Sequence, residues 1–182
     1  MKFQYISDSN MGYAKEIDIQ IDKLTNSIEN TTTGEVFDTQ IARLKRTHKE
    51  QIRKTDWKFN WHLELEDNSK EVFKLTTTNN PLIIQGLISI EDKTDHIFMH
   101  LVESSKFNIG KNKTYFGVPG NLVAYACRMS MERGYEGFIA FDAKTVLIQH
   151  YQETLFATHF RGNRMFIDTD AATRLISSYF KH

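Results

Sequence analysis

A glycine-rich turn at residues 117–122 (GVPGNL) has the residue types of an anion-binding site. Gly117 and Gly120 can adopt positive φ values and let a ligand approach the backbone, and Pro119 is tolerated in the first turn of a helix. A phosphate or pyrophosphate would bind well here, because the first N–H groups of a helix are unpaired and carry the positive end of its dipole. The patterns G-x-G-x-x-G and G-K-[ST] are absent, and an ordinary loop before a helix is the alternative interpretation.

Four other side chains could move a proton. Glu103 follows the apolar run 97–102 (IFMHLV), and Asp142 lies within GFIAFDA, so both carboxylates adjoin predicted strands. His100 and His150 titrate near neutral pH. Each also has a structural interpretation: a solvated strand end for Glu103, a carboxylate paired with a basic neighbour for Asp142, and a hydrogen-bonded ring for either histidine.

Metal and thiol chemistry are not indicated. Cys127 is the only cysteine, which excludes an intramolecular disulfide and a cysteine-based zinc cage. Its place within a predicted helix suits a small core residue better than a nucleophile. The histidines and carboxylates show no metal-ligand spacing, so the sequence predicts no metal site.

The composition is typical of one soluble domain. With 23 basic and 23 acidic residues the net charge is zero, which gives no argument for nucleic acid or a membrane as the obligatory partner. The first residues lack the pattern of a signal peptide, and the longest apolar stretch, residues 81–90, is too short to cross a bilayer. No linker or repeat divides residues 1–182. These features predict a single-domain cytoplasmic protein.

Strands and helices must hold the candidate residues in place, and the periodicity of apolar residues predicts where the strands lie. Alternation of apolar and polar residues predicts strands over residues 57–66, 71–76, 81–91 and 96–104. The apolar stretch 137–143 predicts a strand buried in a sheet interior. Residues 157–168 predict one or two strands that turn at 161–163, and residues 1–7 predict another strand.

Apolar residues at helical spacing predict the helices. Ile41, Leu44 and Ile52 lie near one face of a helix over residues 40–54, and Gly134 is the expected end of a helix over 121–133. Helices are also predicted over residues 16–28, 145–154 and 170–180. A strand meander followed by a strand–helix–strand crossover predicts a mixed α/β (α+β) fold, with a central, mostly antiparallel sheet flanked by helices.

The second half of the chain closely resembles the GNAT superfamily of N-acetyltransferases in the order and spacing of its motifs. Residues 120–124 (GNLVA) match the start of the helix that holds the coenzyme A pyrophosphate, and residues 133–135 (RGY) match its end. Residues 150–156 (HYQETLF) match a later helix that bears a tyrosine. Three departures are visible: Pro119 lies in the glycine-rich part, the usual Arg or Gln is missing, and Phe156 replaces a common Gly.

The resemblance implies a GNAT-like acyl-CoA N-acyltransferase fold that spans residues 1–182. It implies a variable acceptor side at 1–56 and a cofactor-binding core at 57–182. The implied activity is direct transfer of an acetyl group from acetyl-CoA to an amine of an unknown acceptor. A homodimer is compatible with it, and a membrane partner is not expected.

The resemblance also implies roles for individual residues. The strand at 96–104 would pair with the pantetheine chain through Leu101 and Val102, in a slot created by splaying from the strand at 137–143. The residues implied in pyrophosphate binding are Gly117, Val118, Gly120, Asn121 and Leu122. Tyr151 matches the tyrosine that acts as general acid toward the leaving thiolate, and Glu103 is the candidate general base, acting directly or through water.

Two alternatives to an active acetyltransferase remain. Basic residues crowd positions 43–54, followed by Trp57 and Trp61, and this combination can bind single-stranded nucleic acid. A solvated helix face is the more favoured explanation, so nucleic acid is not the expected partner. The second alternative is a catalytically inactive acyl-CoA-binding or interaction module with the same fold, which the departures in the turn leave open.

Overall fold

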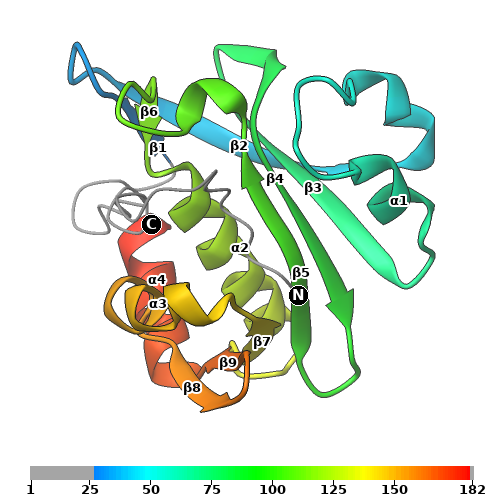
Figure 1. Cartoon of the computed structure of the whole chain (residues 1–182), viewed down its shortest axis with the longest axis vertical. Helices are drawn as coiled ribbons and strands as arrows, with labels where there is room; N and C mark the ends of the chain where they lie inside the picture. The colour runs from blue at the N-terminus through cyan, green and yellow to red at the C-terminus, as the bar shows by residue number, and fades with distance from the viewer. Residues whose placement is uncertain (1–26, 181–182) are drawn as a thin grey trace.

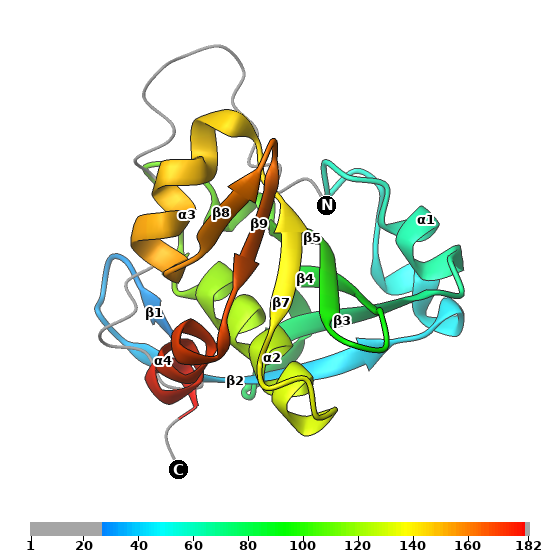
Figure 2. The same cartoon turned by 90° about the horizontal axis from the view of Figure 1, so that it is seen from below.

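The computed structural model describes residues 27–180, which form a strongly curved sheet with helices on both faces (Figures 1 and 2). In this part of the chain the sheet has nine strands, in the order β6-β1-β2-β3-β4-β5-β7-β9-β8. The strands are β1 (Ser27–Asn30), β2 (Val36–Leu44), β3 (Lys70–Thr77), β4 (Asn80–Asp92), β5 (Ile97–Ser104), β6 (Tyr115–Phe116), β7 (Ile139–Asp142), β8 (Thr158–Arg161) and β9 (Arg164–Ile167). The α-helices are α1 (Trp61–Glu66), α2 (Val118–Glu132), α3 (Ile148–Leu155) and α4 (Thr169–Tyr179), and the short 3₁₀ turns are η2 (Arg46–Gln51), η3 (Lys106–Asn108) and η4 (Thr145–Leu147).

The sheet is mostly antiparallel, as predicted. Among the described strands, the pairing of β5 with β7 is the parallel one, and every other neighbouring pair is antiparallel. The parallel pair is joined by a crossover through α2, the connection that such a pair requires. The mixed α+β fold class is therefore confirmed, together with the predicted strands that became β3, β4, β5 and β7, the β8–β9 hairpin, and helices α2, α3 and α4.

Two apolar cores lie on opposite faces of the sheet. The larger core joins α2 and α4 to one face and includes Met99, Val102 and Phe141. The smaller core lies under residues 46–66 on the other face and includes Trp57 and Trp61. Figure 2 shows this arrangement, with α2 and α4 on one side of β4 and β5, and α1 on the other.

The predicted helix over residues 40–54 is wrong. Residues 36–44 form β2, which pairs with both β1 and β3, and a short 3₁₀ turn, η2, follows. Phe37 and Ile41 pack against the larger core, whereas Leu44 belongs to the smaller one. The spacing of Ile41 and Leu44 fits a helix by coincidence, and pairing with β3 decides the structure because tertiary context outweighs local propensity.

The predicted strand over residues 57–66 is also wrong. Residues 57–60 are irregular and residues 61–66 form α1. Trp61 and Leu65 are buried one helical turn apart, whereas Leu63, which the alternating pattern placed with them, is exposed. A run this short can fit both the two-residue period of a strand and the 3.6-residue period of a helix. Alternation alone therefore does not decide between them.

The structure leaves two N-terminal predictions outside the described residues. The strand at 1–7 lies wholly outside them, and so does the helix at 16–28 except for Ser27 and Ile28, which begin β1. No helix among residues 27–180 has the length and apolar character needed to cross a membrane.

Candidate functional site

The strands β5 and β7 separate after two paired residues. Ile97 pairs with Ile139 and Phe98 pairs with Ala140, after which β5 continues to Ser104 without β7 beside it. The separation coincides with a β-bulge in β5. Leu101 is opposite Ser89 of β4, whereas Met99 is opposite the next residue, Ile90, so His100 is an extra residue on β5. A bulge bends its strand, which gives a physical reason for the separation.

The bulge sets which side chains flank the gap between β5 and β7 (the slot). On the face toward α2, Met99 and Val102 belong to the larger core. Tyr151 of α3 lies on this face too, with its ring edge-on to Phe141 of β7 at 5.8 Å between centroids. Tyr151 is 1% exposed. On the opposite face, Leu101 packs against the smaller core. The predicted acid Tyr151 therefore lies on the α2 side of the slot.

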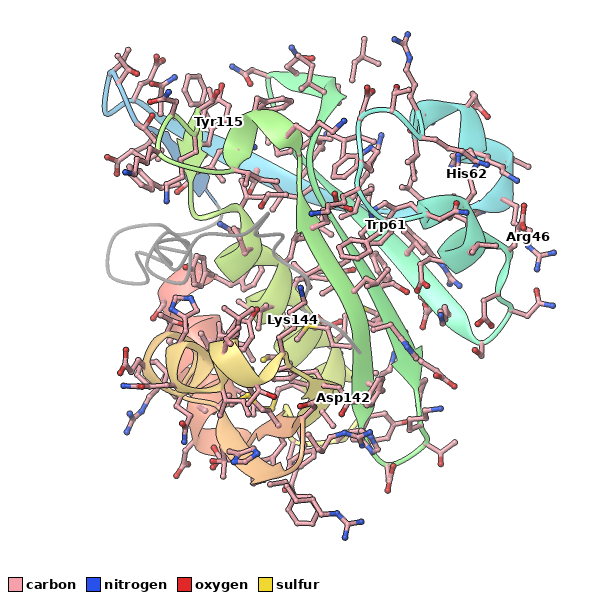
Figure 3. All side chains as sticks on the ribbon, viewed as in Figure 1. Arg46, Trp61, His62, Tyr115, Asp142 and Lys144 are labelled. Atoms are coloured by element: carbon pink, nitrogen blue, oxygen red, sulfur yellow. The ribbon has the colours of Figure 1, made fainter. Side chains whose placement is uncertain are left out.

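Glu103 lies on the face opposite α2, and its carboxylate anchors the chain before α1. Glu103 is 4% exposed. Oε1 accepts a hydrogen bond from the backbone N–H of Lys58 at 2.7 Å, and Oε2 accepts from the N–H of Phe59 at 3.3 Å and from Nε1–H of Trp61 at 2.6 Å. Figure 3 shows Trp61 beside β5. Three donors separated from Glu103 by more than forty residues were not foreseeable from the sequence.

The turn before α2 has part of the backbone geometry predicted for it, because Gly120 lies inside the helix and does not adopt a positive φ. Gly117 adopts φ 88°, a left-handed conformation that favours glycine, and Pro119 lies in the first helical turn. The first helical hydrogen bond runs from Asn121 N–H to Gly117 O at 3.0 Å. In the described part of the chain, the N–H groups of Val118 and Gly120 have no acceptor, although both residues are buried and Val118 is 0% exposed.

The side chains of this turn serve the fold. Asn121 donates from Nδ2 to the carbonyls of Gly117 and Ser27, at 2.8 and 2.9 Å. Val118 and Leu122 are in the larger core, and all five residues implied in pyrophosphate binding are buried. A pyrophosphate at this turn would have backbone N–H groups, and not these side chains, as its donors.

Asp142 and His100 each have a charged partner on the face opposite α2. Arg164 of β9 pairs with Asp142 at 2.5 Å and lies over the ring of Phe98; Figure 3 labels Asp142 and Lys144 near the end of β7. Nε2 of His100 is 2.7 Å from Oε2 of Glu91. Burial lowers the pKa of His100, and the hydrogen bond to Glu91 opposes this effect in part.

The basic segment 43–54 is largely engaged within the protein. Arg43 pairs with Glu71, and Arg46 donates to the carbonyl of Leu65 and to other acceptors at the end of α1. Trp57 and Trp61 are 7% and 1% exposed, so neither ring offers a surface on which a base can stack. The two tryptophans that suggested nucleic-acid binding therefore belong to the smaller core, whereas Lys45, Arg53 and Lys54 are exposed.

The remaining candidates for chemistry are Cys127 and the side chains that could bind a metal ion. Burial raises the pKa of the Cys127 thiol well above its usual range, which disfavours the nucleophilic thiolate. Within residues 27–180, no group of three or more His, Cys, Asp or Glu side chains is placed to hold a metal ion.

Comparisons with known proteins identify the fold. No protein-family model matches the chain, and no curated protein matches it in sequence. Among solved structures, the AtaTR complex bound with acetyl-CoA superposes with a TM-score of 0.53 at 16% identity, covering 76% of this chain and 98% of that one. A mutant AtaT toxin with acetyl-CoA and the C-terminus of the antitoxin AtaR gives 0.52 at 14% identity, covering 77% and 99%. The KacTA–DNA complex gives 0.51 at 10% identity, covering 77% and 99%.

The chain therefore has the fold of the GNAT acetyltransferases, as its motifs predicted. At this level of identity the similarity defines the architecture, and the activity has to be argued from the site itself.

Proposed function

We propose that this protein transfers an acetyl group from acetyl-CoA to an amine of an acceptor molecule, by direct attack of the amine on the thioester. The observation that supports this most strongly is the separation of β5 from β7 at the His100 bulge, which leaves β5 without β7 beside it as far as Ser104, the end next to the first turn of α2. A GNAT fold with this slot offers hydrogen-bonding backbone groups to the pantetheine chain and helix N–H groups to the pyrophosphate.

The proposed cofactor site follows β5 and the turn before α2. Leu101 and Val102 lie in the part of β5 that β7 leaves unpaired. The N–H groups of Val118 and Gly120 are the anion donors, with the conformation of Gly117 setting the turn. Gly86 places α2 against the sheet: a Cβ there would lie 2.6 Å from Cγ1 of Val118.

The proposed chemistry uses one group on each face of the slot. Tyr151, on the α2 side, donates a proton to the leaving sulfur, and a base on the other face, for which Glu103 is the candidate from the sequence, accepts the proton of the ammonium. The three hydrogen bonds to Glu103 also give it a structural function, because they attach residues 58–61 to β5. The acceptor side is proposed to include residues 1–56, and the cofactor-binding core residues 57–182.

Acetyl-CoA titration combined with an acetylation assay tests this proposal. Calorimetry measures binding of acetyl-CoA, and release of the coenzyme A thiol is followed with a panel of polyamines, aminoglycosides, amino acids and lysine-containing peptides. The proposal expects binding and amine-dependent thiol release. Absence of acetyl-CoA binding would contradict the cofactor assignment.

A catalytically inactive acyl-CoA-binding module is the second candidate. It is favoured by the absence of an Arg or Gln in the turn and by Pro119, which removes one of the N–H donors at the start of α2. The same titration separates the two candidates: tight acetyl-CoA binding without turnover on any amine of the panel supports the inactive module.

A further inference from the structure

The imidazole of His100 lies at the bulge where β5 leaves β7, on the face of the sheet opposite Tyr151. We propose that His100, oriented by Glu91, accepts the proton of the acceptor ammonium, and that Glu103 is a positioning residue for the segment 58–61. This inference rests on the proposed acetyl transfer and assigns its base.

The direction of the slot places the reacting end of acetyl-CoA near this bulge. Gly86 pairs with Ser104 at the far end of β5, and Val118 packs directly on Gly86, so the anion-binding turn lies beside that end of the strand. From Ser104 back to Met99 the strand extends roughly 17 Å at its usual rise per residue, which is comparable with an extended pantetheine arm. The slot ends where Phe98 pairs with Ala140, one residue before Met99 and two before His100.

The contact with Glu91 fixes which nitrogen of His100 can act as a base. An ionised carboxylate only accepts hydrogen bonds, so Nε2 of His100 carries the hydrogen that Glu91 Oε2 receives. Nδ1 then keeps its lone pair. Burial alone would raise the pKa of Glu91, but its hydrogen bonds to Lys93 and His100 outweigh this effect and hold that pKa below its usual range.

The surroundings of His100 keep its ring neutral near pH 7. Burial is the main cause of its lowered pKa, and Lys70 of β3 acts in the same direction. Glu91 of β4 and Glu64 of α1 raise the pKa and only partly offset this. The side chain is 23% exposed, so it is accessible from the side away from α2.

Glu103 is less suited to accept the proton. Both of its carboxylate oxygens already accept hydrogen bonds, from Lys58 and Phe59 and from the indole of Trp61. Protonation of either oxygen would disrupt contacts that attach residues 58–61 to β5. These hydrogen bonds suit a residue that holds residues 58–61 in position beside the proposed site.

The proposed step balances in protons and electron pairs. Nδ1 of His100 takes one proton from the ammonium, and the freed nitrogen lone pair forms the C–N bond to the acetyl carbon. The C–S bond breaks, and the sulfur keeps that electron pair and takes the proton of Tyr151. The second proton lost by the nitrogen returns to the Tyr151 phenolate, and the imidazolium releases its proton to solvent.

The protonation state of His100 can be measured without any acceptor. The protein is labelled with ¹⁵N-histidine, and the His100 signal is assigned by its loss in His100→Gln. We expect hydrogen on Nε2 at pH 7 and a titration midpoint below 6.5, which is the ordinary value. Glu91→Gln removes a cause that raises this pKa, so the midpoint should fall further. Hydrogen on Nδ1, or a midpoint at or above 6.5, overturns the proposal.

The pH dependence of turnover provides the second test, with an amine from the panel on which the wild-type protein is active. His100→Gln should lower kcat/KM by roughly 10²- to 10⁴-fold and remove the acidic limb of the pH profile. His96→Gln is a matched control, because His96 is similarly exposed and also contacts a carboxylate, that of Asp95. It should leave both the rate and the profile unchanged.

Glu103→Gln distinguishes positioning from catalysis. We expect a higher KM with the acidic limb retained. Loss of that limb in Glu103→Gln, with its retention in His100→Gln, would assign the base to Glu103 and overturn the proposal. If the wild-type protein acetylates no amine, the proposed function fails and this inference fails with it; wild-type turnover together with an unaffected His100→Gln variant overturns the inference alone.

Discussion

Glu103 and Trp61 are joined by a hydrogen bond of 2.6 Å from the indole Nε1–H to the buried carboxylate. This bond connects β5 to helix α1, which covers the face of the sheet opposite α2. It starts from the part of β5 that has no β7 beside it, along which the thioester is proposed to bind. Trp61 also meets Trp57 edge-on at 6.3 Å, so the carboxylate and the smaller core hold the same segment from two sides. One side of the proposed site therefore depends on a buried side chain whose hydrogen-bond donors come together only in the folded chain.

Trp61→Phe should destabilise the protein by about 1–3 kcal/mol, because it removes a donor from a buried carboxylate. A phenyl ring replaces the indole, so much of the apolar packing is preserved. Trp57→Phe is the matched control: it removes a similar volume from the same core and leaves all three donors to Glu103 in place. Urea denaturation measures both variants. An equal loss of stability in the two would show that volume, and not the hydrogen bond, is responsible.

Tyr151→Phe should lower kcat/KM roughly 10²- to 10⁴-fold while acetyl-CoA still binds, because a general acid typically contributes that much. The ring and its contact with Phe141 are kept. Tyr125→Phe on α2 removes a hydroxyl from a half-buried ring that packs on Phe73, and it should leave turnover unchanged. Full turnover in Tyr151→Phe would contradict the acid assignment.

The sequence was informative where a segment's structure depends on its own residues. Apolar runs and helical spacing identified β5, α2, β7 and α3, and the glycine turn was placed correctly at the start of α2. The errors lie in residues 40–66, where the helical spacing of Ile41 and Leu44 was misleading, because the two side chains lie in cores on opposite faces of the sheet. Pairing of β2 with β3, which lies about thirty residues further along the chain, decides the structure there.

The details of the site depend on contacts that no local pattern encodes. The bulge at His100 is visible only in the register between β4 and β5. The partners of Glu103 come from residues 58–61, and the partner of Asp142 is Arg164 from another strand. Residue types identified Glu103 and His100 as proton-transfer candidates, and only their contacts separate a positioning residue from a base.

Gly86→Ala should destabilise the protein by about 1–3 kcal/mol, the usual cost of overpacking a close contact. The new Cβ would lie 2.6 Å from Cγ1 of Val118 and 3.0 Å from Cδ1 of Leu122. Because the clash would displace the first turn of α2, acetyl-CoA binding should also weaken. The double variant Gly86→Ala/Val118→Ala relieves the closest contact and should recover part of the stability lost by Gly86→Ala. Thermal unfolding of the wild-type protein, both single variants and the double variant tests this, and additive losses in the double variant would contradict it.

Arg133→Gln should cost about 1 kcal/mol or less at pH 7, the range measured for partly exposed ion pairs. Arg133, at the end of α2, contacts Glu71 of β3 at 2.6 Å and Asp92 of β4 at 3.1 Å. Burial alone would raise the pKa of Asp92, but hydrogen bonds from Thr94 and Tyr135 and the charge of Arg133 outweigh it, so the pKa lies below 3.8.

The sign of the pH effect follows from that lowered pKa. A carboxylate whose pKa is lower in the folded state stabilises the fold above its unfolded pKa, and this contribution disappears as the pH falls through the folded value. The stability difference between the wild-type protein and Arg133→Gln should therefore be present at pH 7 and shrink below pH 3.8. Urea denaturation of both proteins across this pH range measures the stability difference. Arg128→Gln is the control, because its partner Glu132 lies in the same helix. A difference that stays constant down to strongly acidic pH would show that Arg133 acts through packing of its side chain and not through its charge.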